Sequence, residues 1–597
     1  MKKTCTAMLA AALAGCFFLT GCSLIPGASL STDTETAGAA PGLADDEAVT
    51  AAVTADLDVS FDEEDLSGDW DEDGAAAFAE GTVITGAGTY VLTGQISSCV
   101  VIAAGDDDDV QLILDGVTIT NASGPAIDVQ SADKVTITLK DGTENRISDG
   151  SSYDLTGLSE NADGAVFSKA DLVINGGGSL TVTGSYKHGI VSKDDLTVAS
   201  GTLIVTAQNV GLSGKDSVRI AGGTVTVTAG TDGIRSDNDE DAEKGFVYVG
   251  GGTVTITAGN DGIQAETALE IAGGTVDIVS GGGSGVSSPD ASESRKGLKA
   301  GASLLISGGT VTVDAADDAV HTNGSAAVTG GILSLSSGDD GIHADGTLEL
   351  SGGSVTVLRS YEGLEATYLT VSGGTHSVTA SDDGLNAAGG NDGGEGGFFG
   401  PDSFGGGTGT LLISGGYLLV DSGGDGLDAN GTLTVTGGVT LVSGPVNGGN
   451  GSLDYDGAGT VTGGTVIALG SSGMAMNFSS AENQGSILLN LGAQSAGTGF
   501  ALCSEDGTVI ASFTPSKAYE TAVVTSPDVR PGGTYVAVLG GTVSGADENG
   551  YASGGTVSGG TAAATVALTS SLYSEGGMTG GMGGGFGGGP GGGPGRR

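Results

Sequence analysis

Apolar and polar residues alternate along most of this chain in short runs. Residues 89–94, 110–119 and 135–139 place apolar side chains mainly at every second position. This period of two predicts strands that bury one face. Later runs such as 222–227 and 252–256 combine glycine turns with alternating Thr and Val or Ile, and β-branched residues favour strands. The pattern therefore predicts an all-β chain of many short strands.

The strands recur with a fixed period. The motif Asp-Asp-Gly-Ile-His-Ala-Asp at 339–345 has related copies at 317–323, 361–366 and 382–387, spaced by 21 to 22 residues. A constant period in the low twenties is typical of a solenoid, in which each repeat forms one coil stacked on the last. We therefore expect coils of about 21–22 residues, with β caps over both open ends because an uncovered end exposes strand edges.

The repeat and its breaks predict the organisation of the chain. From the N-terminus we expect a lipoprotein signal peptide at 1–22, an acidic flexible tether at 23–75, an N-terminal cap with the first coils at 76–160, the regular β-helix at 161–480, a C-terminal β cap at 481–545 and a low-complexity Gly-rich tail at 546–597. Three insertions interrupt the regular coils, near 237–246, 283–296 and 388–409.

The N-terminal segment resembles a bacterial lipoprotein signal. Lys2 and Lys3 precede an apolar run at 7–19, and the segment ends in Leu-Thr-Gly-Cys at 19–22. The resemblance implies that Cys22 is lipidated and becomes the new N-terminus; the alternative is an ordinary signal peptide that ends near a cysteine. Acyl chains on Cys22 would anchor an extracytoplasmic protein to the cell membrane at the cell surface.

Composition and charge narrow the classes of partner. With 116 Gly, 11 Pro and no strict Gly-X-Y triplet, the chain is not collagen-like. The net charge of −52 argues against a nucleic-acid partner, which needs a basic surface, and favours metal cations or a solvated extracellular surface. Beyond the signal, only Cys99 and Cys503 remain. They are either buried free thiols or a bridged pair, and their spacing does not suggest zinc.

Acidic residues recur at fixed positions of the repeat, chiefly just before its glycine. Equivalent residues in stacked coils lie about 4.8 Å apart, where two carboxylates repel by about 1 kcal/mol in water and about 3–4 kcal/mol at a dielectric near 20. Ca²⁺, which takes 6–8 oxygen ligands, would relieve this repulsion; the alternative is a solvated acidic face. The predicted metal residues are Asp232, Asp261, Asp317, Asp318, Asp339, Asp340, Asp345, Glu362, Glu365, Asp382, Asp383, Asp425 and Asp428.

Other side chains are candidates for contact with a sugar. Alternation places Ile342 and Ala344 inward, so we expect His343 and Asp345 on the outer surface. Candidate carbohydrate-binding residues in the motifs and in one insertion are His321, His343, Phe398, Phe399 and Phe404. The alternative for the insertion is a floppy Gly-rich loop.

The motifs at 317–323, 339–345, 362–366 and 382–387 resemble the bacterial carbohydrate-binding β-helix family typified by a clostridial cellulose- and pectate-binding lipoprotein. Further stretches that fit lie at 116–120, 142–145 and 233–245. The resemblance implies a right-handed parallel β-helix, bound Ca²⁺, and binding to cellulose or acidic pectin-like polysaccharide. It also implies a relation in fold to calcium-dependent polysaccharide lyases.

Three functions stay open. The first is a monomeric, calcium-binding and carbohydrate-binding surface lipoprotein. The second is a calcium-dependent polysaccharide lyase, which needs a basic residue beside the metal. Lys296 and Lys299 are the candidates, although the sequence favours the alternative that they pair with neighbouring acids. The third is a non-catalytic adhesin or spacer. Glycine-rich runs here join strands and do not open helices, so nucleotide binding finds no support.

Overall fold

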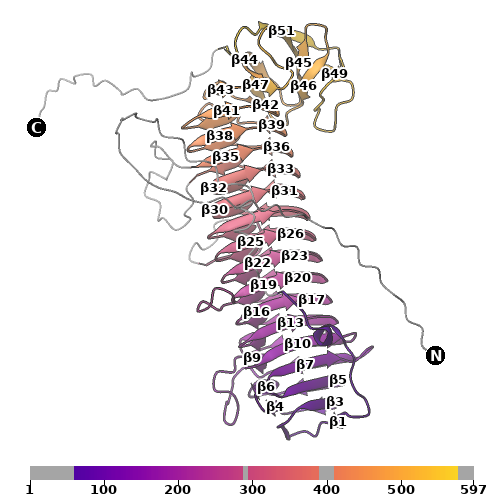
Figure 1. Ribbon diagram of the computed structural model, residues 1–597. Helices are drawn as coiled ribbons and strands as arrows, with labels where there is room; N and C mark the ends of the chain where they lie inside the picture. Colours follow the sequence, from indigo (N-terminus) through magenta and orange to yellow (C-terminus); the bar gives the residue numbers. More distant parts are fainter. Residues whose placement is uncertain (1–58, 287–292, 389–408, 576–597) are drawn as a thin grey trace, which may run out of the picture. The chain divides into compact units, whose positions relative to one another are not determined.

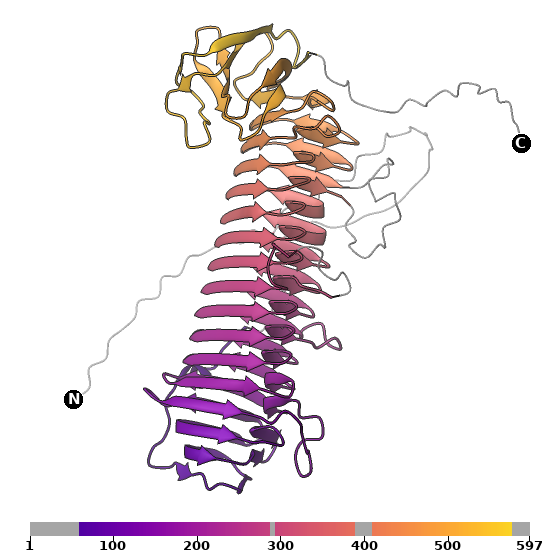
Figure 2. The ribbon, with the colours of Figure 1, turned by 180° about the vertical axis from the view of Figure 1, so that it is seen from behind.

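The computed structural model describes residues 59–286, 293–388 and 409–575, all of which belong to one unit of the chain, Asp46–Arg597. These residues form a parallel β-helix. Each complete coil contributes one strand to each of three parallel stacks, and successive coils lie side by side in Figures 1 and 2. The register pairs Val320 with Ile342 and Ile342 with Leu364, an interval of 22 residues each time. The predicted fold class and coil length are confirmed.

The strands of the first stack pair in chain order from the N-terminal end of the coils. They are β1 (Ala76–Ala77), β3 (Gly88–Ile96), β5 (Asp109–Thr120), β7 (Lys134–Leu139), β10 (Asp171–Gly176), β13 (Asp195–Val198), β16 (Ser217–Ile220), β19 (Phe246–Val249), β22 (Ala268–Ile271), β25 (Ser303–Ile306), β28 (Ser325–Val328), β30 (Ile342–Leu350), β32 (Leu364–Val371), β35 (Thr410–Ile413), β38 (Thr432–Val435), β41 (Gly459–Val461) and β43 (Ser480–Ala481).

The second stack begins on the last residues of β3, which pair with the C-terminal half of β5. Its strands are β8 (Glu144–Ser148), β11 (Ser179–Gly184), β14 (Thr202–Ala207), β17 (Thr224–Ala229), β20 (Thr253–Ala258), β23 (Thr275–Ser280), β26 (Thr310–Ala315), β29 (Ile332–Ser337), β31 (Ser354–Arg359), β33 (Thr375–Thr379), β36 (Tyr417–Asp421), β39 (Val439–Ser443) and β42 (Thr465–Gly470).

The third stack consists of shorter strands and includes the first residues of β30 and β32. Its other members are β2 (Val83–Ile84), β4 (Val100–Ala103), β6 (Ile127–Ser131), β9 (Gly164–Ser168), β12 (His188–Ser192), β15 (Leu212–Gly214), β18 (Ile234–Ser236), β21 (Ile263–Ala265), β24 (Leu298–Ala300), β27 (Val320–Thr322), β34 (Leu385–Ala387), β37 (Leu427–Ala429) and β40 (Leu453–Tyr455).

The core runs through the centre of the coils as one continuous cluster of buried apolar residues from Ile84 to Val523. In β26 the pattern is regular: Val311 and Val313 are buried, while the intervening Thr312 is exposed. Equivalent side chains of neighbouring coils therefore stack on one another inside the helix, and each repeat is stabilised mainly by the repeats on either side of it.

The segment before the first coil packs against the coils and differs from the predicted tether. A short helix α2 (Glu63–Leu66) places Asp65 Oδ1 2.8 Å from Lys134 Nζ on β7. Asn175 Nδ2 donates to the carbonyl oxygens of Ser67 and Asp65, at 2.7 Å and 3.1 Å. The predicted tether at 23–75 therefore extends too far, because residues from 59 onward pack against the coils. The polar contacts that order residues 59–75 have no period in the sequence.

The C-terminal end of the coils is covered by strands that pair mostly antiparallel. These strands are β44 (Gly485–Gln494), β45 (Phe500–Ser504), β46 (Val509–Phe513), β47 (Tyr519–Ser526), β48 (Thr534–Leu539), β49 (Thr542–Val543), β50 (Val557–Ser558), β51 (Thr561–Ala567) and β52 (Leu572–Ser574). β47 pairs antiparallel with β42, the last strand of the second stack, so this stack has no open edge at its C-terminal end. β52 pairs parallel with β44. The predicted start of the tail at 546 is wrong, because β51 completes a four-stranded sheet beside β48.

Candidate metal and carbohydrate site

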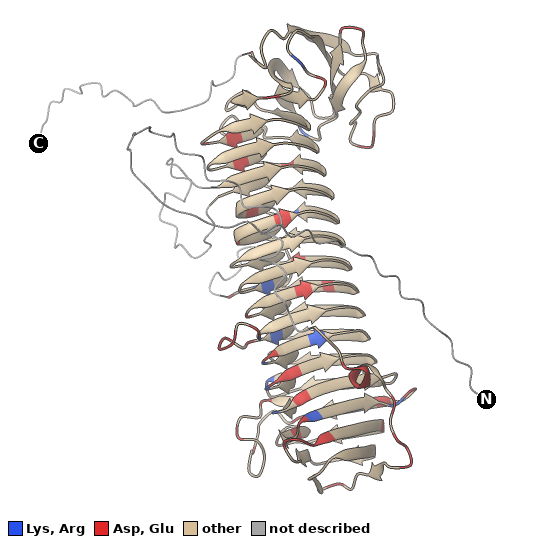
Figure 3. Cartoon of the chain, in the orientation of Figure 1, with Lys and Arg blue, Asp and Glu red and all other residues tan. Residues whose placement is uncertain are grey.

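A column of polar residues follows the corner between the second and third stacks. Each member lies directly before the glycine or alanine that precedes a third-stack strand, as Asp340 does before Gly341 and β30. We call this set the corner column: Asp232, Asp261, Lys296, Asp318, Asp340, Glu362, Asp383 and Asp425. Figure 3 shows acidic residues recurring from coil to coil, with basic residues among them in only part of the stack.

The column carboxylates hold successive coils together. In four of the described coils the Oδ1 atom accepts a hydrogen bond from the backbone amide at the equivalent position of the next coil. These bonds run from Lys296 to Asp261 at 2.8 Å, from Asp340 to Asp318 at 3.0 Å, from Asp425 to Asp383 at 2.5 Å and from Gly451 to Asp425 at 2.5 Å. A carboxylate at this corner therefore has a structural use before any ligand is considered, since it satisfies a backbone donor at the turn.

In the N-terminal part of the column the chain supplies its own cations. Asp232 Oδ2 lies 3.3 Å from Arg235 Nη1. Asp261 Oδ2 lies 3.4 Å from Lys299 Nζ. These ion pairs offset the repulsion between stacked carboxylates that the sequence led us to expect.

Lys296 takes the place of an acid in the column and neutralises the acids of the next coil. Its Nζ atom contacts Asp318 and lies 3.3 Å from Asp317 Oδ1. Burial alone would raise the pKa of Asp318, but the hydrogen bond with His321 and the charge of Lys296 more than offset it and hold the pKa below its usual value. The group Asp317, Asp318 and Asp339, whose ligand atoms lie within 4.8 Å of one another, therefore already contacts a cation of the chain.

The two lysines proposed as lyase bases both lie against acids. Lys296 is buried between Asp317 and Asp318. Lys299 pairs with Asp261 and lies 3.0 Å from the Ser294 hydroxyl. The contacts fit the alternative interpretation of this basic cluster, in which the lysines balance neighbouring carboxylates.

His343 lies at the centre of a second group. Its Nδ1 atom is 3.0 Å from both Asp340 Oδ2 and Glu365 Oε2, and its Nε2 atom is 3.1 Å from Asp345 Oδ1. The ring stacks on His321 with centroids 5.0 Å apart. Both imidazoles are buried, so the prediction that His343 lies on the outer surface is wrong. Alternation along β30 does point the ring away from the core, but the stacked ring and the surrounding acids enclose it.

Burial and crowding change the protonation of this second group. Burial raises the pKa of Asp340 well above its usual value, and the negative charges of Asp318 and Glu365 add to the shift. Burial alone would raise the pKa of Glu365, but the hydrogen bond with His343 and the charge of His343, together with a hydrogen bond with Asp340, lower it. The neutral form is thus favoured for Asp340 and the charged form for Glu365.

The C-terminal part of the column differs because its carboxylates lie in a stretch without basic residues. Asp383, Asp425 and Asp428 bring their ligand atoms within 4.8 Å of one another. The sequence contains no Lys or Arg from 360 to 516. Burial, together with the negative charge of Asp383, raises the pKa of Asp425 to about 7. Closely spaced carboxylate oxygens are the ligands that a hard cation such as Ca²⁺ prefers.

A buried amide next to this group offers a further ligand. Asn386 lies between Glu365 and Asp428 in the register of the third stack, and its Nδ2 atom donates to Glu362 Oε2 at 2.8 Å. Burial raises the pKa of Glu362 to about 8. Within the described residues, the buried Oδ1 atom of Asn386 has no hydrogen-bond partner. A cation or a water molecule would satisfy it.

The predicted site residues fall into distinct sets. Eight of the predicted metal residues come together in three groups: Asp317, Asp318 and Asp339; Asp340 and Glu365 with His343; and Asp383, Asp425 and Asp428. The other five predicted metal residues, outside these groups, are Asp232, Asp261, Asp345, Glu362 and Asp382. Phe398, Phe399, Phe404 and Cys22 lie outside the described residues.

The sequence offered the pairing of Lys296 with neighbouring acids as an alternative, and its signal is a lysine that stands where neighbouring repeats have aspartate. One feature of the site was missed in the sequence. The orphan oxygen of Asn386 has no sequence signal, since it depends on contacts between coils.

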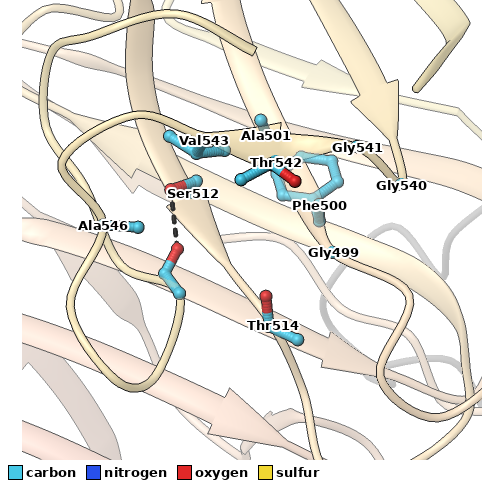
Figure 4. Close-up of a pocket in the computed structure, with 11 residues that line it drawn as sticks. Gly499, Phe500, Ala501, Ser512, Thr514, Gly540, Gly541, Thr542, Val543 and Ala546 are labelled. Carbon is cyan, nitrogen blue, oxygen red and sulfur yellow. Dashed lines mark hydrogen bonds between the residues drawn. The ribbon is translucent and has the colours of Figure 1, made fainter. Parts of the chain in front are cut away.

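The C-terminal sheet carries a small pocket of a different kind. It has a volume of about 170 Å³, and its lining includes Phe500, Thr514 and Thr542 (Figure 4). Ser512 Oγ donates to the Gly550 carbonyl at its edge, 2.7 Å away. No charged side chain lines the pocket, and ligand pockets are commonly larger. Within the described part of the chain, no helix is long and apolar enough to span a membrane, and both Cys99 and Cys503 are free thiols.

Fold and site together define a parallel β-helix protein whose polar corner groups carboxylates that could hold metal ions. A family model described as carbohydrate-binding domain-containing protein matches residues 79–341 and 339–567, more than half of the chain. The chain therefore belongs to this carbohydrate-binding family, and the resemblance seen in the repeat motifs is confirmed.

Two individual proteins are similar to parts of the chain. A carbohydrate-binding domain-containing protein of Acetivibrio thermocellus is 33% identical over 151 residues, which are 25% of this chain and 52% of the relative; the chain thus spans about half the length of the relative. A solved structure, the polysaccharide lyase-like protein from C. thermocellum in its gadolinium derivative, is 34% identical. The matched region covers 33% of this chain and 84% of the chain in the solved structure, with a TM-score of 0.31.

Proposed function

We propose that this protein is a cell-surface lipoprotein that binds polysaccharide, with Ca²⁺ held in the C-terminal part of the corner column. The observation that carries the carbohydrate part is the family match over residues 79–341 and 339–567. The calcium part is supported by the group Asp383, Asp425 and Asp428 and by the orphan Asn386 oxygen beside it.

An acidic, pectin-like polysaccharide suits such a site better than a neutral one. A chain with a net charge of −52 repels polyanions at long range. A calcium ion on the column would reverse this locally, because it can share its 6–8 ligand positions between protein and sugar carboxylates. Lipidation at Cys22 would keep this surface outside the cytoplasmic membrane.

Retention on immobilised polysaccharides tests the function. The purified protein should be retained on polygalacturonate in calcium and released by a chelator. Asp425→Asn should lower retention at least about tenfold in limiting calcium, because one anionic ligand is lost. Asp277→Asn, the same change at a residue of β23 outside the column, should behave as the wild type. If the protein is retained on no polysaccharide, with or without calcium, the proposed function is wrong.

The same preparation tests the lyase alternative. A lyase would release unsaturated products, which absorb in the ultraviolet, from polygalacturonate in calcium. We expect no sustained release, because Lys296 and Lys299 both pair with acids. Sustained release that Lys296→Ala or Lys299→Ala abolishes would replace the binding function with a catalytic one.

A further inference from the structure

Beside the corner column, one coil departs from the repeat. The register of β31 against β29 shifts at its end: Leu335 pairs with Val357, whereas Ser336 pairs with Arg359. One extra residue, Leu358, therefore bulges from the second stack. β-Bulges re-aim side chains and are over-represented beside functional sites. Here the bulge leaves Leu358 and Arg359 exposed at the corner of the coil.

The residues after the bulge also depart from the repeat. Tyr361 stands where the neighbouring coils have Asp339 and Asp382. Its amide donates to the Asp339 carbonyl at 2.7 Å, and its carbonyl accepts from the Asp382 amide at 2.9 Å. Tyr361, which is 49% exposed, thus replaces an acid in a series of equivalent acidic positions. Tyr361, Leu358 and Arg359 line one side of a surface hollow of about 420 Å³, which Ser337 and Ser381 of the adjacent coils complete. This volume lies in the range of ligand pockets.

The charge of Arg359 is anomalous in its surroundings. It is the only Lys or Arg between Lys299 and Lys517 in the sequence. Among the arginines that the structure describes, Arg359 is the one without an ion pair or a side-chain hydrogen bond, although acids flank its coil on both sides. The chain therefore leaves one guanidinium available in a stretch where it has no other basic residue. A guanidinium matches a carboxylate in planar, two-point hydrogen bonding.

We propose that this hollow is a subsite for one uronate residue of a bound polysaccharide, whose carboxylate pairs with Arg359 while its ring lies against Tyr361. Tyrosine offers an apolar face for a sugar ring, and a hydrogen bond between the Tyr361 hydroxyl and Asp382 holds the ring in place. The inference rests on the proposed function and adds to it a second point of recognition that does not require a metal ion. The bulge, the exposed ring and the unpaired guanidinium all occur in the same coil.

Calorimetric titration with short galacturonate oligomers, in calcium and in chelator, tests the subsite. Arg359→Gln should weaken binding of the free acid about tenfold, because a charge-assisted pair is lost, and should leave binding of the methyl-esterified oligomer unchanged. Tyr361→Ala should weaken both, whereas Tyr361→Phe, which keeps the ring, should have a smaller effect. Arg146→Gln removes an exposed arginine on β8 and is the matched control. The three side chains changed in these four variants are exposed, so the unfolding midpoints should match that of the wild type.

The outcomes separate the two proposals. If the wild type binds free-acid oligomers and Arg359→Gln binds them equally well, the subsite is wrong and the proposed function stands. The subsite is also wrong if the wild type does not distinguish free acid from ester, or if a sulfated oligomer binds more tightly than the uronate. If the wild type binds no oligomer and is retained on no polysaccharide, the proposed function fails and the subsite fails with it.

Discussion

A carboxylate in the corner column has two separate roles. Its Oδ1 atom accepts an amide of the next coil, as between Asp318 and Asp340, and its charge needs a counterion. In the N-terminal part that counterion is a side chain of the protein, such as Lys296 beside Asp318. In the C-terminal part, around Asp425, the neighbouring charges are those of acids. The same residue type at the same position therefore differs in its need for a metal.

His376 shows the cost of a polar residue in the interior of the coils. It is fully buried in β33 at a position that pairs with Val355 and Leu418. Its Nε2 atom lies 2.7 Å from the Gly373 carbonyl, and its buried Nδ1 atom has no partner in the described structure. Burial lowers the pKa of His376. The folded state thus holds this imidazole neutral at a pH where the unfolded chain binds a proton.

His376 should therefore make stability depend on pH. As the pH falls below about 6.5 the unfolded chain takes up a proton at this histidine, while the folded protein does not until the lowered pKa is reached, so the free energy of unfolding falls. His376→Leu should lose this contribution. Chemical denaturation of both proteins at pH 7.5 and pH 5.5 checks it: the wild type should lose more stability than the variant. Equal losses would show that His376 is not held neutral.

At the scale of the element, the glycine before each third-stack strand is required by packing between strands. A Cβ atom at Gly384 would lie 2.2 Å from Val420 Cγ1 and 2.7 Å from the Gly426 carbonyl oxygen. Gly426 meets Val442 in the same way, at 2.4 Å. Contacts below 3 Å are not tolerated, so a β-branched residue on the second stack excludes a side chain at this glycine.

One coil carries alanine at this position and supports the rule. Ala319 precedes Val320, which the register equates with Leu298 and Ile342. The facing position of the second stack, equivalent to Val313 and Val357, is Leu335. Leucine branches one carbon later than valine, which leaves room for the extra methyl group.

This pairing predicts a rescue. Gly384→Ala should lower the free energy of unfolding by about 1–3 kcal/mol through overpacking. Adding Val420→Leu, which copies the Ala319 and Leu335 coil, should recover part of that loss. Denaturant unfolding of the two single variants and the double variant measures the coupling. Strictly additive costs would contradict the proposed contact.

At the scale of the whole molecule, the sequence was informative where structure repeats. The period of 21–22 residues predicted the parallel coils, and the alternation predicted buried positions such as Ile342 and Ala344. Segments without a period were misjudged, including residues 59–75 and β51, because their order comes from individual polar contacts and from pairing at the chain end.

The site was predictable to the same extent. The sequence located the acids that stack at the corner, because they recur in register. It did not show which of them the chain neutralises, nor that His343 is enclosed by His321, Asp340 and Glu365. These properties depend on contacts between coils and on the direction of side chains around a corner.

Side chains of the protein balance the N-terminal part of the corner column, and we propose that calcium balances its C-terminal part. Calorimetric titration of metal-free protein with Ca²⁺ tests it, using Asp425→Asn and, as the matched control from another three-acid group, Asp317→Asn. We predict that Asp425→Asn binds Ca²⁺ at least about tenfold more weakly than the wild type, through loss of an anionic ligand, and that Asp317→Asn, whose group contacts Lys296, binds as the wild type does. Unchanged binding in Asp425→Asn, or loss of binding in Asp317→Asn alone, would contradict it.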